Sequence, residues 1–254
     1  MNFINLFKKI YNETGIVFTQ NEDIVQKKII RFFESKGFTT LNDFEQSINN
    51  NSLLYQELIN LITTSETYFY REFSQIEFCI QKVKELNRKV KILSAPCASG
   101  EEPYSILIAL LEAGVDLKNI EIYGVDINSD EINRAKKGLF KSRRLYRLSQ
   151  TIIEKYFTKE EDDNYRITLD LQQDINFIQL NLFEPLPAQL NNFDIIFSRN
   201  MLIYFDKEAK LKIEKIFYDK LVKGGVLLLG HADIIENRCG FTKELNHQVS
   251  YYFK

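Results

Sequence analysis

Two acidic residues stand at the start of a predicted helix, directly after a loop of small residues. The apolar residues Val90, Ile92 and Leu93 are typical of a buried strand. Gly100 then allows a tight turn, and Glu101 and Glu102 occupy a position that favours acidic side chains. Strand, loop and helix in this order open a nucleotide-binding βαβ unit.

The same loop disfavours a phosphate-bearing ligand. A dinucleotide fingerprint carries three glycines, whereas this loop has only Gly100 and is followed by two acids. A ligand with an adenosine and a cationic or zwitterionic tail fits better, and S-adenosylmethionine is such a ligand. A strand, loop and helix that serve only the fold remain the alternative.

A further carboxylate, Asp126, ends the next predicted strand, residues 120–126. It follows Gly100 by 26 positions, near the place where such folds hold the ribose hydroxyls with an acid. A carboxylate accepts both hydroxyl protons, which no neutral side chain does as well. The alternative is a strand-end acid that only caps the next turn.

Composition narrows the class of protein. The chain has 254 residues, 44% hydrophobic and 27% charged, with no apolar run near the roughly 20 residues that cross a bilayer. Three separated cysteines and two histidines predict no metal site. No signal-peptide pattern opens the sequence, so we expect a reduced, cytoplasmic protein without membrane insertion. A net charge of -2 argues against a general nucleic-acid binder.

The positioning elements divide into two parts. Residues 1 to about 72 have helical periodicity, with helices expected from about residue 21 to Gly37, over 40–50 and over 52–62. Within the first of these helices, Lys27, Lys28 and Arg31 fall within about one turn, which is typical of a solvated face. Ser74 and Glu77 form a capping box for the helix that follows this part.

From Lys89 onward strands and helices alternate, which predicts an α/β fold with strands over 193–200, 226–230 and 249–253. Alternation of Tyr165, Ile167, Leu169 and Leu171 with polar residues predicts a half-exposed strand in a small antiparallel excursion. The most basic stretch faces either solvent or an acidic partner; it contains Lys136, Lys137, Lys141, Arg143, Arg144 and Arg147.

Five motifs give a specific resemblance. In chain order they read ITTSETYFYRE, ILSAPCASGEEPYSI, YGVDIN, FDIIFSRNMLIYFD and GGVLLLGHAD. Together they resemble the CheR family of chemoreceptor glutamate methyltransferases. The resemblance implies a class I methyltransferase sheet of seven strands with the last one antiparallel, in residues 73–254. It also implies a helical domain in residues 1–72 and a β excursion at about 157–176.

The resemblance further implies transfer of a methyl group from S-adenosylmethionine to glutamate side chains of chemotaxis receptors. The products are a glutamate methyl ester and S-adenosylhomocysteine. The cofactor-binding residues implied by motif position are Ser65, Thr67, Arg71, Glu101, Asp126, Asn181, Leu182, Arg199 and Asn200. Arg71 and Tyr204 would act at the reacting end, Glu101 near the ammonium, and Asn181 and Leu182 beside the adenine.

The chain departs from the family pattern in two places. Ser65 stands where many members have asparagine. The acidic loop between Phe157 and Tyr165 has no glycine, unlike members whose excursion docks a receptor tail peptide, so tail docking is left open.

The chemistry needs no general base, because a glutamate carboxylate with a pKa near 4.3 is already charged at neutral pH. Arg71 would orient that carboxylate through its planar fork, and Tyr204 would sit beside the methyl group. Lys27, Lys28 and Arg31 would steer acidic receptor helices by charge. We expect a monomer whose partners are the cytoplasmic domains of chemotaxis receptors.

Two other functions stay open on sequence grounds. The first is a small-molecule or nucleic-acid methyltransferase; amino-group methylation of bases usually relies on an Asn-Pro-Pro-Tyr type loop, but Arg199, Asn200, Met201 and Leu202 stand there. A domain of this family that binds the cofactor without turnover would serve as an interaction module.

Overall fold

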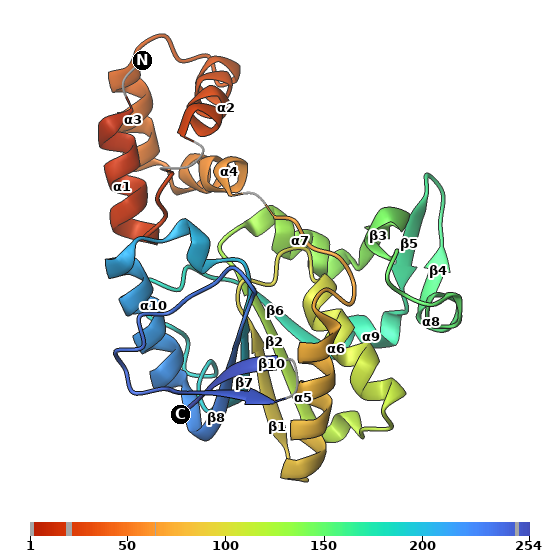
Figure 1. Ribbon diagram of the computed structural model, residues 1–254. Coiled ribbons are helices and arrows are strands. Elements are labelled where there is room, and N and C mark those ends of the chain that lie inside the picture. Colours follow the sequence, from red (N-terminus) through yellow and green to blue (C-terminus); the bar gives the residue numbers. More distant parts are fainter. Residues whose placement is uncertain (1–2, 19–21, 64, 247–248) are drawn as a thin grey trace.

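A seven-stranded sheet forms the centre of the computed structural model (Figure 1), which describes residues 3–18, 22–63, 65–246 and 249–254, with only the backbone at 169 and 170. Five parallel strands come first in the sheet order: β6 (Ile175–Gln179), β2 (Ile120–Asp126), β1 (Val90–Ser94), β7 (Phe193–Ser198) and β8 (Leu221–Leu229). Antiparallel β10 (Val249–Phe253) and β9 (Thr242–Asn246) complete it. The predicted sheet with its antiparallel last strand is confirmed.

Both faces of this sheet are covered at its centre, which explains why the central strand β7 is buried along its whole length. All six residues of β7 are buried; Ile195 and Phe197 face one hydrophobic cluster, and Ile196 faces the other. The first cluster includes side chains from α5 (Phe73–Leu86), α6 (Glu101–Glu112) and α7 (Ser129–Lys137). The second includes side chains from α10 (Lys207–Lys220).

Four helices form a separate bundle above the sheet in Figure 1. They are α1 (Ile4–Thr14), α2 (Glu22–Ser35), α3 (Leu41–Asn50) and α4 (Ser52–Ile62). Their apolar faces enclose a third hydrophobic cluster that contains Ile29, Phe44 and Leu58. The helices expected over 40–50 and 52–62 are confirmed, whereas residue 21, the expected start of the second helix, lies outside the described residues.

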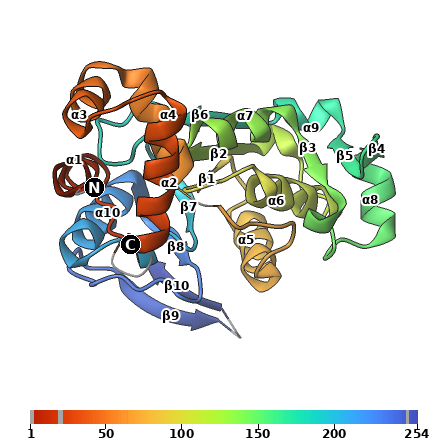
Figure 2. The ribbon, with the colours of Figure 1, turned by 90° about the horizontal axis from the view of Figure 1, so that it is seen from above.

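The antiparallel excursion is a three-stranded sheet at the far end of the molecule from the helical bundle (Figure 2). Its order is β3 (Leu139–Lys141), β5 (Asn164–Ile167) and β4 (Phe157–Lys159), with 3-10 helix η2 (Ser142–Arg144) and α8 (Gln150–Tyr156) between β3 and β4. The strand expected through Leu171 ends at Ile167, because α9 (Leu169–Gln173) follows. Leu171 is buried from that helix instead.

Two further expectations differ from the structure. Helix α5 begins at Phe73, one residue before the expected cap, because Glu72 takes the left-handed conformation with φ 48°. Ser74 therefore lies inside the helix. The edge strand β9 was not expected, since its burial pattern is exposed almost throughout and shows no alternation.

Two short 3-10 helices, η1 (Leu117–Asn119) and η3 (Leu202–Tyr204), complete the secondary structure. Across the described ranges, no helix is both long and apolar enough to cross a bilayer. The same ranges contain no group of three or more His, Cys, Asp or Glu side chains that could hold a metal ion.

Candidate active site

A cavity of about 310 Å³ lies at the carboxyl ends of the parallel strands, where open α/β sheets bind their ligands. Its walls come from both parts of the chain. The sheet part contributes the loops after β1, β2, β6 and β7, and the helical bundle with its flanking segments contributes Thr14, Ile16, Phe18 and Ile62. Residues 65–67 and Arg71, which belong to the connection between the two parts, also line it.

Asp126, at the end of β2, is 7% exposed and lines this cavity. Its carboxylate accepts hydrogen bonds from the backbone N–H groups of Ala98 and Asn128, each at 2.9 Å. Burial raises the pKa of Asp126 to about 6, although these hydrogen bonds oppose the shift. The strand end and the small-residue loop after β1 thus hold one carboxylate rigidly at the cavity wall.

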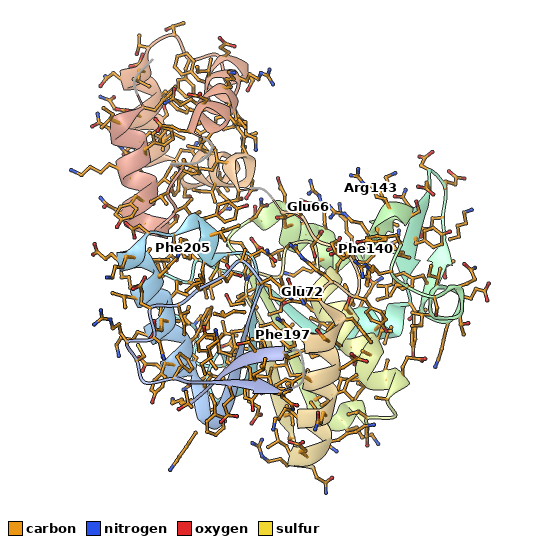
Figure 3. The ribbon with its side chains drawn as sticks, in the orientation of Figure 1. Glu66, Glu72, Phe140, Arg143, Phe197 and Phe205 are labelled. Atoms are coloured by element: carbon orange, nitrogen blue, oxygen red, sulfur yellow. The ribbon has the colours of Figure 1, made fainter. Side chains whose placement is uncertain are left out.

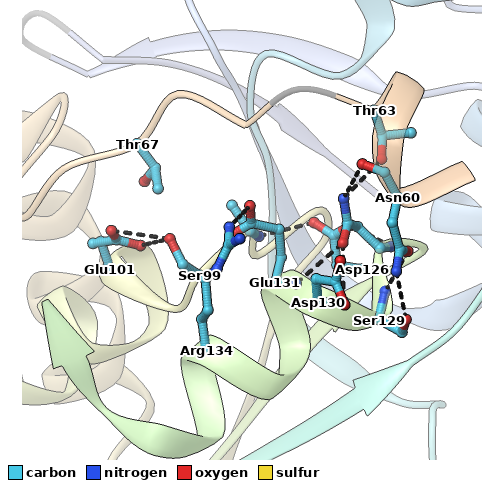
Figure 4. Close-up of polar contacts among 12 residues, drawn as sticks. Asn60, Thr63, Thr67, Ser99, Glu101, Asp126, Ser129, Asp130, Glu131 and Arg134 are labelled. Atoms are coloured by element: carbon cyan, nitrogen blue, oxygen red, sulfur yellow. Dashed lines mark hydrogen bonds and ion pairs between the residues drawn. The ribbon is translucent and has the colours of Figure 1, made fainter. Parts of the chain in front are cut away.

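Asn128 connects this carboxylate to Asn60 and Thr63 of the helical bundle, which are labelled with Asp126 in Figure 4. Its Oδ1 caps α7 by accepting from the N–H groups of Asp130 and Glu131, at 3.0 and 3.1 Å. Its Nδ2 donates to the carbonyl oxygen of Asn60 at 3.1 Å and to Thr63 Oγ1 at 2.9 Å, both at the end of α4. One side chain therefore caps a helix of the sheet part and fixes α4 beside it.

Glu102 and Arg199 form a buried ion pair that sequence reasoning missed. Arg199 Nε lies 2.5 Å from Glu102 Oε2, with side chains 4% and 7% exposed. Ser94 Oγ, on β1, donates to Glu102 at 2.7 Å, and Arg199 Nη1 donates to the Arg71 carbonyl oxygen at 2.7 Å. Glu102 and Arg199 both line the cavity, so the pair links the start of α6 to the connecting segment.

Glu101, the glutamate expected beside the cofactor, does not line the cavity. Its side chain is 1% exposed and accepts from Ser99 Oγ at 3.0 and 2.8 Å, with Arg144 Nε at 3.7 Å. Burial raises the pKa of Glu101. Neighbouring helix positions differ in direction by about 100°, which is why one glutamate reaches the cavity and the other turns away. Glu102 therefore lines the cavity, and the expected position of Glu101 near the ammonium stays a prediction.

The loop after β7 carries an unpaired acceptor into the same region. Among the described residues, Asn200 Oδ1 is buried and has no hydrogen-bond partner. Asn200 has φ 57°, and its backbone N–H and that of Leu202 donate to the Asp233 carboxylate. A Cβ at Gly230 would lie 2.9 Å from the Asn200 nitrogen, so this position suits only glycine. A fixed loop therefore presents an acceptor that a ligand donor can satisfy.

The residues expected at the reacting end, Thr67, Arg71 and Tyr204, all line the cavity. Arg71 Nη1 donates to the Glu66 carbonyl oxygen at 2.6 Å, and its guanidinium lies 5.6 Å from the Tyr68 ring centre. The backbone of Tyr204 accepts from the Val17 N–H at 2.9 Å. The Tyr204 backbone is therefore fixed where the segment after α1 meets the loop after β7.

Ser65, Asn181 and Leu182 also line the cavity. The Asn181 side chain is already engaged, because Nδ2 donates to the Glu13 carbonyl oxygen at 2.8 Å and Oδ1 accepts from the Phe183 N–H at 3.0 Å. Asn181 thus braces the helical bundle, and its expected contact with adenine stays a prediction.

The basic residues of α2, Lys27, Lys28 and Arg31, do not line the cavity. Lys27 and Arg31 are exposed. Lys28 Nζ donates to the Leu61 carbonyl oxygen at 3.1 Å, near the end of α4. Part of this basic face therefore supports the bundle rather than being free for a partner.

The fold and the site together define the class. The seven-stranded sheet has the strand order and the antiparallel last strand of a class I methyltransferase. Its cavity, with an acid at the end of the second strand of the chain, lies where that class binds its cofactor. Residues 65–250 match the family model described as CheR methyltransferase, SAM binding domain. The chain belongs to this family.

Curated relatives extend the match over nearly the whole chain. A chemotaxis protein methyltransferase of Campylobacter jejuni is 40% identical over 252 residues, which cover 99% of this chain and 95% of the relative. Chemotaxis protein methyltransferase 2 of Vibrio cholerae is 36% identical, covering 95% and 89%. The Escherichia coli protein of the same description is 28% identical, covering 91% and 84%.

Proposed function

We propose that this enzyme methylates glutamate side chains of chemotaxis receptors, using S-adenosylmethionine and releasing S-adenosylhomocysteine, in sensory adaptation. The proposal depends on one observation: the same cavity is lined by Asp126, Asn200, Arg71 and Tyr204. The family match supports methyl transfer, and the relatives' names support a chemotaxis protein as the substrate.

The donor groups of the cavity fit this cofactor. Asp126 is an acceptor for two ribose hydroxyls, and the unpaired Asn200 Oδ1 is a buried acceptor for a cationic or hydroxyl donor. Asp126 supplies negative charge near a ligand whose sulfonium and ammonium are positive, whereas the charge of Glu102 is balanced by Arg199. Leu182 and the neighbouring Asn181 would flank the adenine.

The reaction needs orientation more than proton transfer. When bound, the cofactor supplies an electrophilic methyl group on a positive sulfur. The substrate glutamate is ionised at neutral pH, so its carboxylate oxygen attacks directly and no base takes a proton. Arg71 holds that carboxylate through its guanidinium fork, and Tyr204 limits its approach. Ile16, Phe18 and Met201 provide apolar walls that keep water out.

The receptor would approach over the helical bundle and the mouth of the cavity. The exposed Lys27 and Arg31 on α2 attract acidic helices of the receptor at long range. We propose that a single copy of the enzyme acts in the cytoplasm, on the cytoplasmic domains of the receptors.

The test combines calorimetry with a radiolabelled transfer assay. S-adenosylhomocysteine should bind with one site per chain, and labelled methyl should enter purified receptor as a base-labile ester. The receptor is assayed with and without its C-terminal tail, because the acidic β4–β5 turn leaves tail docking open. Cofactor binding without base-labile label would contradict the proposal.

A further inference from the structure

Two arginines and two tyrosines gather beside the mouth of the cavity, and we call them the arginine–tyrosine surface: Tyr68, Arg71, Tyr146 and Arg147. The two tyrosine rings lie 5.1 Å apart. The Arg147 guanidinium lies 5.5 Å from the Tyr146 ring centre and 5.9 Å from that of Tyr68. Arg71 lies 5.6 Å from the Tyr68 ring centre. Segments almost 80 positions apart in sequence thus build one surface.

This surface stands on a rigid base. The Phe69 N–H donates to the Arg144 carbonyl oxygen at 3.0 Å, and Arg144 Nη1 donates in turn to the Thr67 carbonyl oxygen. Phe69, Leu145 and Leu148 are 0%, 2% and 7% exposed in the core beneath. Tyr146, by contrast, is 61% exposed. The exposed aromatic and cationic groups are therefore held in place before any partner arrives.

The positive charge of this surface is not balanced within the part of the chain that the structure describes. There, Arg71, Arg147 and the neighbouring Arg143 have no carboxylate within 4 Å. The half-buried Arg144 of the same stretch does face a carboxylate, that of Glu101, at 3.7 Å. Arg147 donates from Nε to Tyr146 Oη at 3.3 Å, and its position beside the tyrosine rings keeps its two Nη groups available as donors.

The position of the surface relates it to the substrate. Arg71 lines the cavity, and Tyr68 follows directly on the lining residues 65–67. Figure 3 shows Glu66 and Arg143 on the side of the molecule between the helical bundle and the antiparallel sheet. A protein segment that places one side chain in the cavity must lay its neighbouring residues across this rim.

We propose that the arginine–tyrosine surface binds acidic residues that flank the glutamate to be methylated. This inference rests on the proposed function and names a docking surface separate from α2. Arginine pairs with carboxylates through two parallel N–H···O bonds, and rigid tyrosine rings supply contact area at small entropic cost. Arginine and tyrosine are also the residue types that dominate the binding energy of interfaces.

The experiment measures methylation against the concentration of a purified cytoplasmic fragment of a methyl-accepting receptor. Arg147→Glu should raise the KM for the fragment about tenfold, since it places a like charge against the acidic segment. The matched control is Lys118→Glu, the same reversal at an exposed residue of η1 that precedes β2 and so lies at the other end of the sheet. It should leave the KM unchanged.

Calorimetry with S-adenosylhomocysteine separates docking from cofactor binding. Both variants should bind it as the wild type does, which also shows that they fold. Tyr146→Ala serves as a second variant without charge reversal and should raise the KM about threefold. Equal KM values for Arg147→Glu, Tyr146→Ala and Lys118→Glu would overturn the proposal. A wild type that methylates no receptor fragment would overturn the proposed function instead.

Discussion

Two effects on the protonation of Asp126 oppose each other: burial favours the neutral acid, and the proposed contact with the ligand needs the carboxylate. Its burial favours the neutral acid, and its pKa is about 6, above the ordinary value of 3.8. The proposed role of Asp126, accepting from two ribose hydroxyls, requires the carboxylate. The backbone N–H groups of Ala98 and Asn128 compensate in part, because they donate to the ionised form. We therefore expect ligand binding at this site to depend on pH just below neutrality.

We expect the affinity for S-adenosylhomocysteine to fall about tenfold between pH 7 and pH 5, because protonation of Asp126 removes an acceptor. Calorimetry over this range measures it. The raised pKa of Asp126 affects the stability of the fold in the opposite direction from ligand affinity. Between about pH 4 and 6 the folded state binds more protons at Asp126 than the unfolded state, so its contribution to stability grows as pH falls.

Asp126→Asn is the control for that profile. This substitution removes the titrating carboxyl group with little change in size. The variant should bind S-adenosylhomocysteine weakly, and its affinity should stay constant between pH 7 and pH 5. A wild-type affinity that stays constant from pH 7 to pH 5 would show that the carboxylate does not contact the ligand.

Glu101 and Glu102 show how far the sequence alone predicts the position of a single side chain. The loop and the helix start were predictable from Gly100 and from the apolar spacing that follows. Which glutamate faces the cavity depends on helix phase, and α6 is buried on nearly all sides, so no polar face marks the phase. Ser94, which donates to Glu102 from β1, was the available signal.

At the level of elements, predictions succeeded where a local signal ended each element. Helix α4 begins after Asn51, whose Oδ1 accepts from the N–H groups of Leu53 and Leu54, and β2 ends at Asp126. They failed where tertiary contacts decided the outcome. The left-handed Glu72 sets the start of α5, and β9 exists because it pairs with β10. The loops after β6 and β7 were placed at the site only through the family resemblance.

The amide of Asn128 donates two of the hydrogen bonds that connect α4 to the start of α7, and Asn60 and Ser129 supply two more. Asn128→Asp keeps the acceptor that caps α7 but loses the donors to the Asn60 carbonyl oxygen and Thr63 Oγ1. We expect a loss of about 1–3 kcal/mol in unfolding free energy, since a carboxylate then faces a carbonyl oxygen. Urea unfolding measures this loss, and calorimetry should show weaker S-adenosylhomocysteine binding because the Asp126 loop is attached to Asn128.

Asn51→Asp is the matched control, because Asn51 also caps a helix with Oδ1 but is exposed at the start of α4, away from α7. A carboxylate there favours the helix N-terminus, so stability should be unchanged or slightly higher. If the two variants behave alike, the amide donors of Asn128 do not hold α4 in place.

For the whole molecule, the two parts of the chain have separate cores but share the cavity. The bundle has its own hydrophobic cluster, and its being a separate domain stays a prediction. The shared wall was not predictable, because periodicity shows which face of a helix is buried and not where the bundle sits on the sheet. Besides the contacts of Asn128 to α4, that placement is held by Val17 N–H to the Tyr204 carbonyl oxygen, Tyr11 Oη to Asp206, and Asn181 to the Glu13 carbonyl oxygen.

A ligand in a shared cavity must therefore stabilise both parts. At a hundredfold excess over its Kd, S-adenosylhomocysteine should raise by about 2.7 kcal/mol the free energy of every opening motion that releases it. Amides that exchange only through such an opening should therefore exchange about a hundredfold more slowly. Hydrogen exchange should show this slowing at residues 16–18 and 65–71 as well as at residues 96–98 and 199–204, since all four line the cavity.

The β9–β10 pair provides the internal reference, because its strand β9 is exposed at the sheet edge and does not line the cavity. Its amides open locally without releasing the ligand, so their exchange should keep its rate. Slowing confined to residues 96–98 and 199–204 would mean that the helical bundle is not a wall of the binding site. Slowing at residues 16–18 as well requires that the bundle moves away before the ligand leaves, so ligand release and domain opening are one event.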